Sequence, residues 1–182
     1  MMVTEAQNMN EAWKNLIERR SCRKYRAEQI KTEELDAILE AGTYAPTGRG
    51  LQTPLIVAVQ DPETLKEVQR LNARVMGDEN AATFYGAPTV LVVFGIRDNA
   101  LSTADGNLVI GNLLNAANAV GVDSCYIWRA AESFESEEGK ALMRKWGVPE
   151  EYRGIGNVIL GYGVPEGKRP AAPRKEGYII KI

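Results

Sequence analysis

Apolar residues recur at helical spacing in two stretches near the start of the chain. The first pattern predicts a helix that Asn10 caps and that reaches about Arg20, because its apolar positions are three or four residues apart. The second predicts a helix that Thr32 caps and that stops at Gly42. The Pro- and Gly-rich stretch 45–50 is then expected to be a loop.

The middle of the chain alternates between strand-like and helix-like stretches. Residues 55–59 have the composition of a strand. Asp61 followed by Pro62 is typical of a helix start, with a capping carboxylate before proline at the first helical position. The stretch 72–86 has no regular period and is expected to be irregular. The β-branched stretch 89–94 predicts a strand buried on both faces.

The second half of the chain contains one long apolar helix. Residues 102–120 predict a helix with apolar side chains nearly all round, which belongs in the centre of a domain or at an obligate interface. A strand is expected over 123–128, a helix from the cap Ser136 to about Gly147, and a last core strand over 158–160. The predicted fold class is α+β, with a mixed β-sheet packed around the central buried helix.

The chain length predicts one domain. Its 182 residues, 20.0 kDa, are enough to bury a sizeable core. Residues 1–8 are expected to be a flexible leader, and 9–182 a single domain. The stretch 163–182 is an extended tail with no core pattern of its own, yet it ends in apolar residues. We therefore expect this tail to dock on a partner surface.

Composition and charge limit the possible functions. Apolar residues make up 45% and charged residues 25%, as in ordinary globular proteins. The net charge of −2 argues against binding to nucleic acid or to a membrane through bulk charge. The longest apolar run, 90–94, is far shorter than the roughly 20 residues of a membrane helix. With no signal-peptide pattern in residues 1–8, the expected location is cytoplasmic.

The chain contains no histidine. This absence excludes Ser-His-Asp and Cys-His nucleophilic catalysis, histidine-ligated zinc and histidine general acid–base chemistry. The two cysteines, Cys22 and Cys125, are too few and too far apart for a cysteine-only metal site. No metal is expected, and an enzyme of this composition is expected to rely on an organic cofactor.

Four short stretches contain candidate chemistry, and each also has a plainer interpretation. Residues 19–23 group three arginines and a serine, which suit a phosphate, or else form the solvated cationic end of a helix. The glycines of 46–50 allow close approach to a ligand, or belong to an ordinary loop. Residues 121–129 form a strand edge that is either functional or simply core. The basic pairs 168–169 and 174–175 bind an anion or only increase solubility.

Together and in this order, these stretches resemble the nitroreductase family of FMN-dependent oxidoreductases. The resemblance covers roughly residues 11–175. It rests on the Arg-x-Ser-x-Arg/Lys-x-aromatic stretch 19–25, the loop in 41–52 similar to an Ala-Pro-Ser motif, and the Tyr-Gly-Ala-Pro of 85–88. It also rests on 121–127, similar to Gly-Leu-Gly-Ser/Thr-Cys-Trp-Ile, and on the basic tail.

The resemblance implies bound FMN, NADH or NADPH as co-substrate, and an intertwined homodimer with two FMN sites at its interface. The residues implied for the FMN phosphate and ribityl chain are Arg19, Arg20, Ser21, Arg23, Arg174 and Lys175. Those implied for the loop that covers the flavin ring from the other subunit are Pro46, Thr47, Gly48 and Gly50, with Gln52 closing the motif. Those implied for the ring edge are Ile127, Trp128 and Arg129 at N5, and Asn72 at the pyrimidine side.

The chain departs from the family pattern around the expected active site. Gly50 stands where the family often has Asn, so that Arg49 and Leu51 would line the entrance, and we assign both to substrate binding. Trp128 and Arg129 stand where the family commonly has Gly, and they add bulk and positive charge beside N5. These departures leave the acceptor unidentified.

The resemblance implies a ping-pong mechanism, in which NAD(P)H passes a hydride to flavin N5 and a small acceptor, such as a nitroaromatic or quinone, then takes its place. No catalytic side chain is required, which suits a chain without histidine. Cys125 and Tyr126 are candidate proton donors, although packed strand positions explain them equally well. The chain has no Gly-x-Gly-x-x-Gly motif, so no separate nicotinamide domain is expected.

Three alternatives stay open. In the first, the protein is a non-enzymatic flavin-binding module in which Trp128 and Arg129 obstruct the flavin. In the second, it binds phosphate or another anion without flavin, through the arginine cluster of 19–23. In the third, it is a specialised family member that fragments flavin or removes halogen, since the shared motifs do not distinguish these chemistries.

Overall fold

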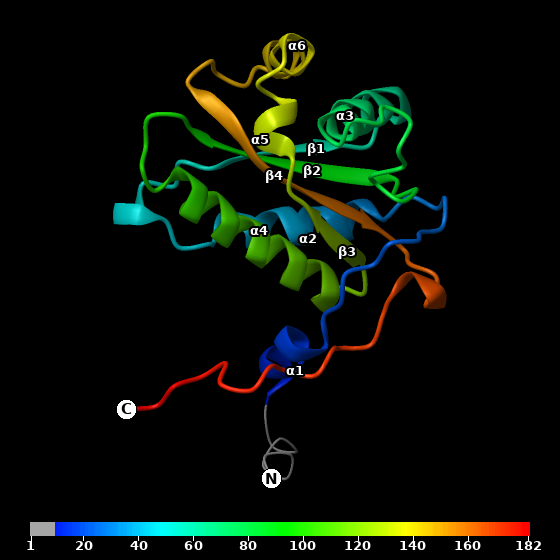
Figure 1. Cartoon of the computed structure of the whole chain (residues 1–182), viewed down its shortest axis with the longest axis vertical. Coiled ribbons are helices and arrows are strands. Elements are labelled where there is room, and N and C mark those ends of the chain that lie inside the picture. Colours follow the sequence, from blue (N-terminus) through cyan, green and yellow to red (C-terminus); the bar gives the residue numbers. More distant parts are fainter. Residues whose placement is uncertain (1–9) are drawn as a thin grey trace.

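The computed structural model describes residues 10–182 and arranges them in three layers (Figure 1). The middle layer is a sheet of β1 (Leu55–Val59), β2 (Thr89–Ile96), β3 (Asp123–Ile127) and β4 (Tyr152–Gly161). One face is covered by α2 (Thr32–Thr43) and α4 (Ser102–Ala119). The other face is covered by α3 (Pro62–Val75), α5 (Ala130–Ser133) and α6 (Glu137–Lys145). The expected leader, residues 1–8, lies outside the described residues.

The strands lie in the order β1-β2-β4-β3, and each neighbouring pair is antiparallel. The central pair joins distant parts of the chain, with Thr89 opposite Leu160. Within residues 10–182, a parallel pairing occurs only as the isolated bridge between Ser21 and Ser124. The α+β class is therefore confirmed, and the mixed character expected of its sheet is limited to this bridge.

β2 is buried on both faces, as its β-branched sequence predicts. Val90, Val92 and Phe94 face the α3, α5 and α6 layer, while Leu91 and Val93 face α2 and α4. All five side chains are fully buried. Because successive residues of a strand point to opposite faces, this one strand contributes to both cores. Burial of each such side chain is worth roughly 1.5–3 kcal/mol, so β2 holds the two outer layers together.

α4 is buried along one side only. Val109, Ile110 and Leu113 pack against α2 and the sheet. On the opposite side, Leu108 is 47% exposed. The expectation of a central apolar helix is confirmed for the inner side, while the outer side presents apolar surface.

The boundaries of α2 differ from the sequence prediction. Thr32 is its first residue and not its cap; the preceding Lys31 donates its N–H to Glu34 Oε2 at 3.0 Å. The helix ends at Thr43, one residue after the predicted stop Gly42, which is buried. A Cβ on Gly42 would lie 2.6 Å from Leu113 Cδ2, so this glycine allows close packing of α2 on α4.

Two other predicted elements are too short. The stretch 72–86 is not wholly irregular, because α3 continues to Val75 and Asn72 lies inside it, buried. A polar residue on the buried face of a helix interrupts the apolar period, which explains the error. The last strand begins at Tyr152 and not near residue 158, since glycines such as Gly154 weaken the strand pattern.

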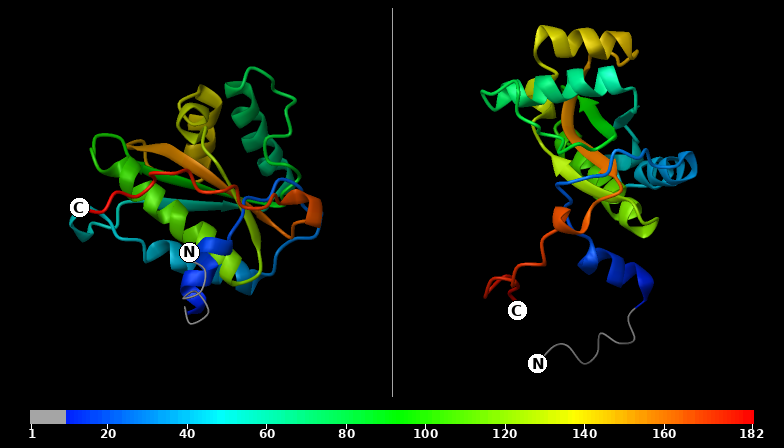
Figure 2. Two further views of the ribbon diagram at one scale, coloured as in Figure 1. Left: turned by 60° about the horizontal axis from the view of Figure 1, so that its bottom comes forward. Right: turned by 90° about the vertical axis from the view of Figure 1, so that its right-hand side faces the viewer.

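α1 (Glu11–Glu18) lies outside the three layers, next to the end of α4 (Figure 2). Asn10 caps it as predicted, its Oδ1 accepting a hydrogen bond from the Trp13 N–H at 3.0 Å. Asn15 joins it to α4 by donating to the Asn115 carbonyl at 2.9 Å. The helix has no buried residue of its own, and Leu16 is 60% exposed.

The last part of the chain also leaves the three layers. After the short helical turn η3 (Pro165–Gly167), it runs away from the sheet (Figures 1 and 2). Its apolar residues Tyr178, Ile179 and Ile180 are 71%, 73% and 83% exposed. In a single chain this tail has no core to bury these side chains.

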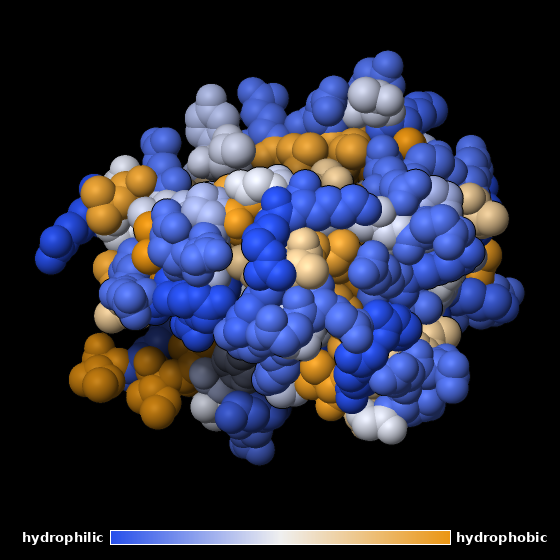
Figure 3. Space-filling model, turned by 90° about the horizontal axis from the view of Figure 1, so that it is seen from above, coloured by the Kyte–Doolittle hydropathy of each residue, from blue (hydrophilic) through white to orange (hydrophobic). Residues whose placement is uncertain are grey.

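The outer surface of the α3 and α6 layer has a different character, because hydrophilic side chains dominate it (Figure 3). Arg70 and Arg74 of α3 both form ion pairs with Glu138 of α6. This face is therefore suited to contact with solvent. In the part of the chain that the structure describes, no helix combines the length and the apolar character needed to cross a bilayer.

Candidate functional site

The arginine-rich stretch that follows α1 is held between two other segments. Ser21 pairs with Ser124 at the beginning of β3, and Cys22 pairs with Lys168 of the tail. The Cys22 N–H donates to the Ser124 carbonyl at 2.9 Å, and the Arg23 N–H donates to the Gly167 carbonyl at 2.8 Å. These backbone bonds fix where the side chains of residues 19–23 emerge.

Buried groups around Cys22 further stabilise this arrangement. Asp123 accepts hydrogen bonds from the Gly163 N–H at 3.1 Å and from Lys168 Nζ at 2.9 Å, which ties the tail to β3. Burial raises the pKa of the Cys22 thiol. Burial also raises the pKa of Tyr25, whose hydroxyl donates to the Cys22 carbonyl at 2.9 Å. Both side chains therefore stay neutral, as expected of packed groups.

Not every side-chain nitrogen of these arginines has a hydrogen-bond partner among residues 10–182. One terminal guanidinium nitrogen of Arg19, Nη1, is buried and has no hydrogen-bond partner among residues 10–182. The Ser124 hydroxyl, 1% exposed, also has no partner there. Arg20 instead folds back and donates to the Ile17 and Arg19 carbonyls, each at 2.7 Å. A buried guanidinium nitrogen without a partner is unfavourable, so Arg19 suits a bound anion such as phosphate, and the Ser124 hydroxyl is a separate unpaired donor.

A second group of predicted residues lies in the turn between β3 and α5. The Ile127 carbonyl accepts from Asn157 Nδ2 at 3.1 Å. The Arg129 carbonyl accepts from the Ser133 hydroxyl at 2.7 Å, and Arg129 Nε donates to Asn72 Oδ1 at 3.1 Å. Three buried polar side chains thus fix this turn, while Trp128 between the two anchored residues is 60% exposed.

The turn packs closely on β4. A Cβ on Gly154 would lie 2.3 Å from the Ala130 carbonyl oxygen, so only glycine fits at this position. A cavity of about 230 Å³ opens beside the turn, and its walls come from α4, α5 and the ends of β3 and β4. The residues that line it are Thr103, Asn107, Tyr126, Trp128, Ala131, Glu132, Arg153, Gly154 and Ile155.

Aromatic and cationic groups give this cavity its chemistry. Arg153 Nη2 donates to Thr103 Oγ1 at 2.7 Å, while its Nε is buried without a partner in the described chain. The Tyr126 hydroxyl donates to Asn107 Oδ1 at 3.4 Å, and burial raises the pKa of Tyr126. With the exposed face of Trp128, these groups suit a flat molecule that carries polar oxygens.

The third group is the loop that contains the short helical turn η2 (Gly48–Gly50). Three of its residues have left-handed backbone angles, with φ of 58° at Arg49, 68° at Gly50 and 51° at Gln52. The Gly48 N–H donates to Asp105 Oδ1 at 3.0 Å, and the Gln52 N–H donates to Thr47 Oγ1 at 2.9 Å. These angles are strained at the non-glycine residues Arg49 and Gln52, and strained residues persist only where their surroundings hold them. Here the buried Asp105 holds the loop through Gly48.

In one chain these groups remain apart. The loop of η2 lies at the start of α4, whereas residues 19–23 lie beyond its other end (Figure 1). Leu51 is 60% exposed at the loop and Pro46 borders a hollow there. Among the described residues, neither Arg174 nor Lys175 bonds to the arginine cluster; Arg174 donates to the Ala172 carbonyl at 2.6 Å. In one chain, therefore, the predicted residues do not form a single site.

Sequence reasoning missed the polar residues that support the site. Asn157, Ser124, Asp105 and Ser133 are all nearly or fully buried. A signal was present in the sequence for Asn157, a single polar residue within the apolar stretch Ile155–Leu160. Asp105, Ser124 and Ser133 have other polar residues beside them, so nothing in the sequence marked them as buried. A buried polar group must find a partner, so these positions mark where the backbone or a ligand is held.

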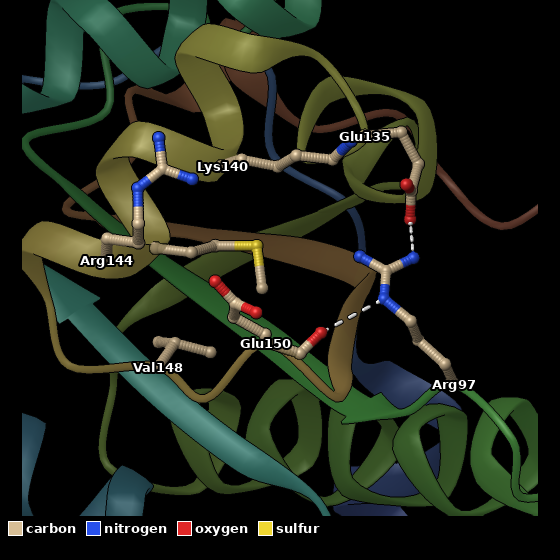
Figure 4. Close-up of a pocket in the computed structure, with 7 residues that line it drawn as sticks. Arg97, Glu135, Lys140, Arg144, Val148 and Glu150 are labelled. Carbon is tan, nitrogen blue, oxygen red and sulfur yellow. Dashed lines mark hydrogen bonds and ion pairs between the residues drawn. The ribbon is translucent and has the colours of Figure 1, made fainter.

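A further hollow of about 320 Å³ lies on the other side of the molecule, between the end of β2, α6 and the segment before β4 (Figure 4). Arg97 dominates it: its Nε donates to the Glu150 carbonyl at 3.2 Å and its Nη1 pairs with Glu135. Lys140 and Arg144 also line the hollow, together with the buried Met143. Because its charges are exposed or already paired, we assign no ligand to this hollow; the Arg97–Glu135 ion pair joins the end of β2 to the segment before α6.

The chain is similar to characterised and solved proteins along most of its length. Residues 16–162 match the protein-family model described as Nitroreductase family. The chain is 40% identical over 184 aligned residues to the FMN reductase (NAD(P)H) of Bacillus subtilis (strain 168), covering 92% of this chain and 72% of that protein.

Two solved structures have the same fold. A nitroreductase with bound FMN from Bacteroides fragilis NCTC 9343 has a TM-score of 0.88 and 29% identity, covering 96% of this chain and 100% of that one. A nitroreductase with bound FMN from Desulfitobacterium hafniense DCB-2 has a TM-score of 0.84 and 25% identity, covering 96% and 99%.

Proposed function

The chain belongs to the nitroreductase family, and on this premise we propose how its residues hold the cofactor and which reaction they support. It is an FMN-dependent NAD(P)H oxidoreductase. Bound FMN supplies the redox chemistry, since its ring can accept a hydride and pass electrons on. We propose a ping-pong reaction in which NAD(P)H and a small acceptor, such as a nitroaromatic or quinone, bind one after the other at the same place.

The phosphate of FMN is proposed to bind at residues 19–23. The observation that carries this assignment is the buried Arg19 Nη1 without a partner among residues 10–182. Arg23 and the hydroxyl of Ser21 lie on the same backbone-anchored segment, and the unpartnered Ser124 hydroxyl adds a donor. Charge-assisted hydrogen bonds to phosphate are about twice as strong as neutral ones, which offsets the burial of this cation.

The reactive edge of the flavin is proposed to lie at the turn 127–129. The turn is rigid because Asn157 and Ser133 hold its two ends. A rigid turn keeps backbone groups in one orientation, so they can favour charge that develops on the ring without reorganising. The adjoining cavity, with Trp128 and Tyr126, supports binding of a flat nicotinamide or aromatic acceptor.

The rest of the site is proposed to come from a second copy of the chain. The loop 46–52 holds Arg49 and Gln52 in left-handed backbone conformations, and it lies at the opposite end of α4 from the arginine cluster of residues 19–23. Exposed apolar side chains such as Leu16 on α1 and Leu108 on α4 support a homodimer. The tail 163–182 is proposed to dock on the partner, which would bury Tyr178 and its apolar neighbours.

The test is an anaerobic titration of the purified protein with NADH and then NADPH, followed by visible absorption. The proposal expects bound flavin whose absorption bleaches within seconds and returns when a quinone or nitroaromatic is added. Flavin that stays oxidised would instead indicate a flavin-binding module without activity. A protein that does not take up added FMN would contradict the proposed function altogether.

FMN titration and steady-state kinetics separate the roles of two residues. Arg19→Gln is expected to weaken FMN binding while leaving the reaction of the residual loaded protein intact. Trp128→Ala is expected to leave FMN bound and to change the Michaelis constant for the acceptor. Arg144→Gln, an exposed cation on α6, is the matched control and should change neither quantity.

A further inference from the structure

Arg153 carries a positive charge that no carboxylate of the described chain neutralises. It is the second residue of β4 and is half-buried, and its Nη2 donates to Thr103 Oγ1 at 2.7 Å. Its Nε is buried without a hydrogen-bond partner among residues 10–182, and no acidic side chain in that range forms an ion pair with it. A half-buried guanidinium that contacts only one neutral hydroxyl is poorly compensated, so an anion beside it would be stabilised.

The cavity of about 230 Å³ beside the turn 127–129 places this cation next to two aromatic side chains. Trp128 and Tyr126 line the cavity together with Arg153, and they are 60% and 38% exposed. Aromatic faces that stay exposed at a cavity offer surfaces on which a flat ring can pack. The volume is below the roughly 300–1,000 Å³ of pockets that hold drug-sized ligands, so the cavity suits a molecule with a single ring.

The other polar groups of the cavity leave the charge of Arg153 free for a ligand. Glu132 of α5 is the one acidic residue among those that line the cavity, and it is exposed to solvent and does not pair with Arg153. Asn107 and the hydroxyl of Tyr126 bond to each other at 3.4 Å. The cavity therefore combines one uncompensated cation with an aromatic wall.

We propose that this cavity binds the electron acceptor and that Arg153 selects acceptors in which a flat ring carries a carboxylate. A guanidinium can donate two parallel N–H bonds to a carboxylate, whereas a neutral amide of the same shape offers it one weaker acceptor. The inference rests on the proposed function, because Trp128 belongs both to this cavity and to the turn at which the reactive edge of the flavin is proposed to lie.

The experiment is isothermal titration of the FMN-loaded, oxidised protein with 4-nitrobenzoate and with 4-nitrobenzamide, which differ in charge and hardly in shape. We expect 4-nitrobenzoate to bind at least about tenfold more tightly. Arg153→Gln should abolish this preference, while Arg153→Lys, which keeps the charge, should retain part of it. Trp128→Ala should weaken both ligands alike, since it removes aromatic surface and no charge. Arg144→Gln, an exposed cation on α6, is the control and should match the unaltered protein.

Steady-state kinetics with NADH separate selection from a structural effect of the substitution. Arg153→Gln is expected to raise KM for 4-nitrobenzoate about tenfold, with kcat and the KM for 4-nitrobenzamide unchanged. Equal binding of the two ligands by the unaltered protein would overturn the inference, as would a preference that persists in Arg153→Gln or disappears entirely in Arg153→Lys. Failure of the unaltered protein to take up FMN, measured beforehand, would instead overturn the proposed function.

Discussion

The carboxylate of Asp105 accepts a hydrogen bond from the backbone N–H of Gly48, with 3.0 Å between Oδ1 and N. Asp105 is 4% exposed in the first turn of α4, and Gly48 begins η2. Because Arg49 next to it has a positive φ, which is strained in a non-glycine residue, the loop needs an anchor to keep this conformation. The bond makes the loop and the start of α4 one rigid unit.

Replacing that anchor is expected to loosen the loop. Asp105→Ala leaves the Gly48 N–H unpaired and should lower the free energy of unfolding by about 1–3 kcal/mol. Because the loop 46–52 is proposed to cover the flavin of the partner, FMN should also bind more weakly. Urea unfolding and FMN titration measure the two effects. Asp105→Asn, which retains an acceptor oxygen, should lose clearly less; equal losses in both variants would contradict the anchoring role.

Arg19 is expected to contribute to FMN binding through its charge. A charge-assisted hydrogen bond is worth roughly 1.5–3 kcal/mol, so Arg19→Gln should raise the FMN dissociation constant about 10- to 100-fold. The loss should shrink as salt concentration rises, since ions screen the attraction between Arg19 and the phosphate that the variant lacks. Isothermal titration with FMN and with riboflavin checks this, because riboflavin lacks the phosphate and should not distinguish the variant from the unaltered protein.

Leu108 tests whether the outer side of α4 lies in an interface. This side chain is 47% exposed in one chain, and a homodimer would bury it. Leu108→Asp should therefore shift the protein to the monomer in sedimentation and release its FMN. Val75→Asp is the control, because Val75 is 39% exposed at the end of α3, in the layer whose outer surface is hydrophilic. Dimers of full stability in Leu108→Asp would contradict the interface.

The ion pairs of Glu138 with Arg70 and Arg74 are expected to make the stability of the fold depend on pH. Its pKa lies below the ordinary glutamate value because Arg70 and then Arg74 donate hydrogen bonds to the carboxylate. A lowered pKa in the folded state adds stability above the pKa of the unfolded chain, and that stability is lost as pH falls through the folded value. Glu138→Gln should thus lower the melting temperature near neutral pH, with the difference vanishing in acid. Glu137→Gln, at an 87% exposed carboxylate, should change little at any pH.

Gly154 is expected to accept no side chain. In Gly154→Ala the new Cβ would meet the Ala130 carbonyl oxygen at 2.3 Å, so either β4 or the turn must move. Overpacking of this kind typically lowers stability by about 1–3 kcal/mol, and the displaced turn should also change the visible spectrum of bound flavin. A variant with unchanged stability and spectrum would show that the turn is more adaptable than its contacts indicate.

Much of the fold follows from local patterns in the sequence. The β-branched stretch of β2, the Asp61-Pro62 helix start and the cap Asn10 are signals that span a few residues, and each predicted its element correctly. The errors arose where tertiary contacts override those signals. The predicted stop at Gly42 is within one residue of the observed end of α2, whereas α3 continues to Val75 through Asn72, whose burial in the fold breaks the apolar period.

The features of the candidate site likewise divide into those that the sequence indicates and those that only the folded structure reveals. By itself the sequence determined that the chain has no histidine, that it groups arginines at residues 19–23, and that its motifs resemble one flavoprotein family. Only the tertiary structure decided that Asn72 holds Arg129 and that Asp105 holds Gly48. Hydrophobic periodicity is a local property, so it can be read along the chain. Polar pairings across some 57 residues depend on the path of the folded backbone, and no local pattern encodes that path.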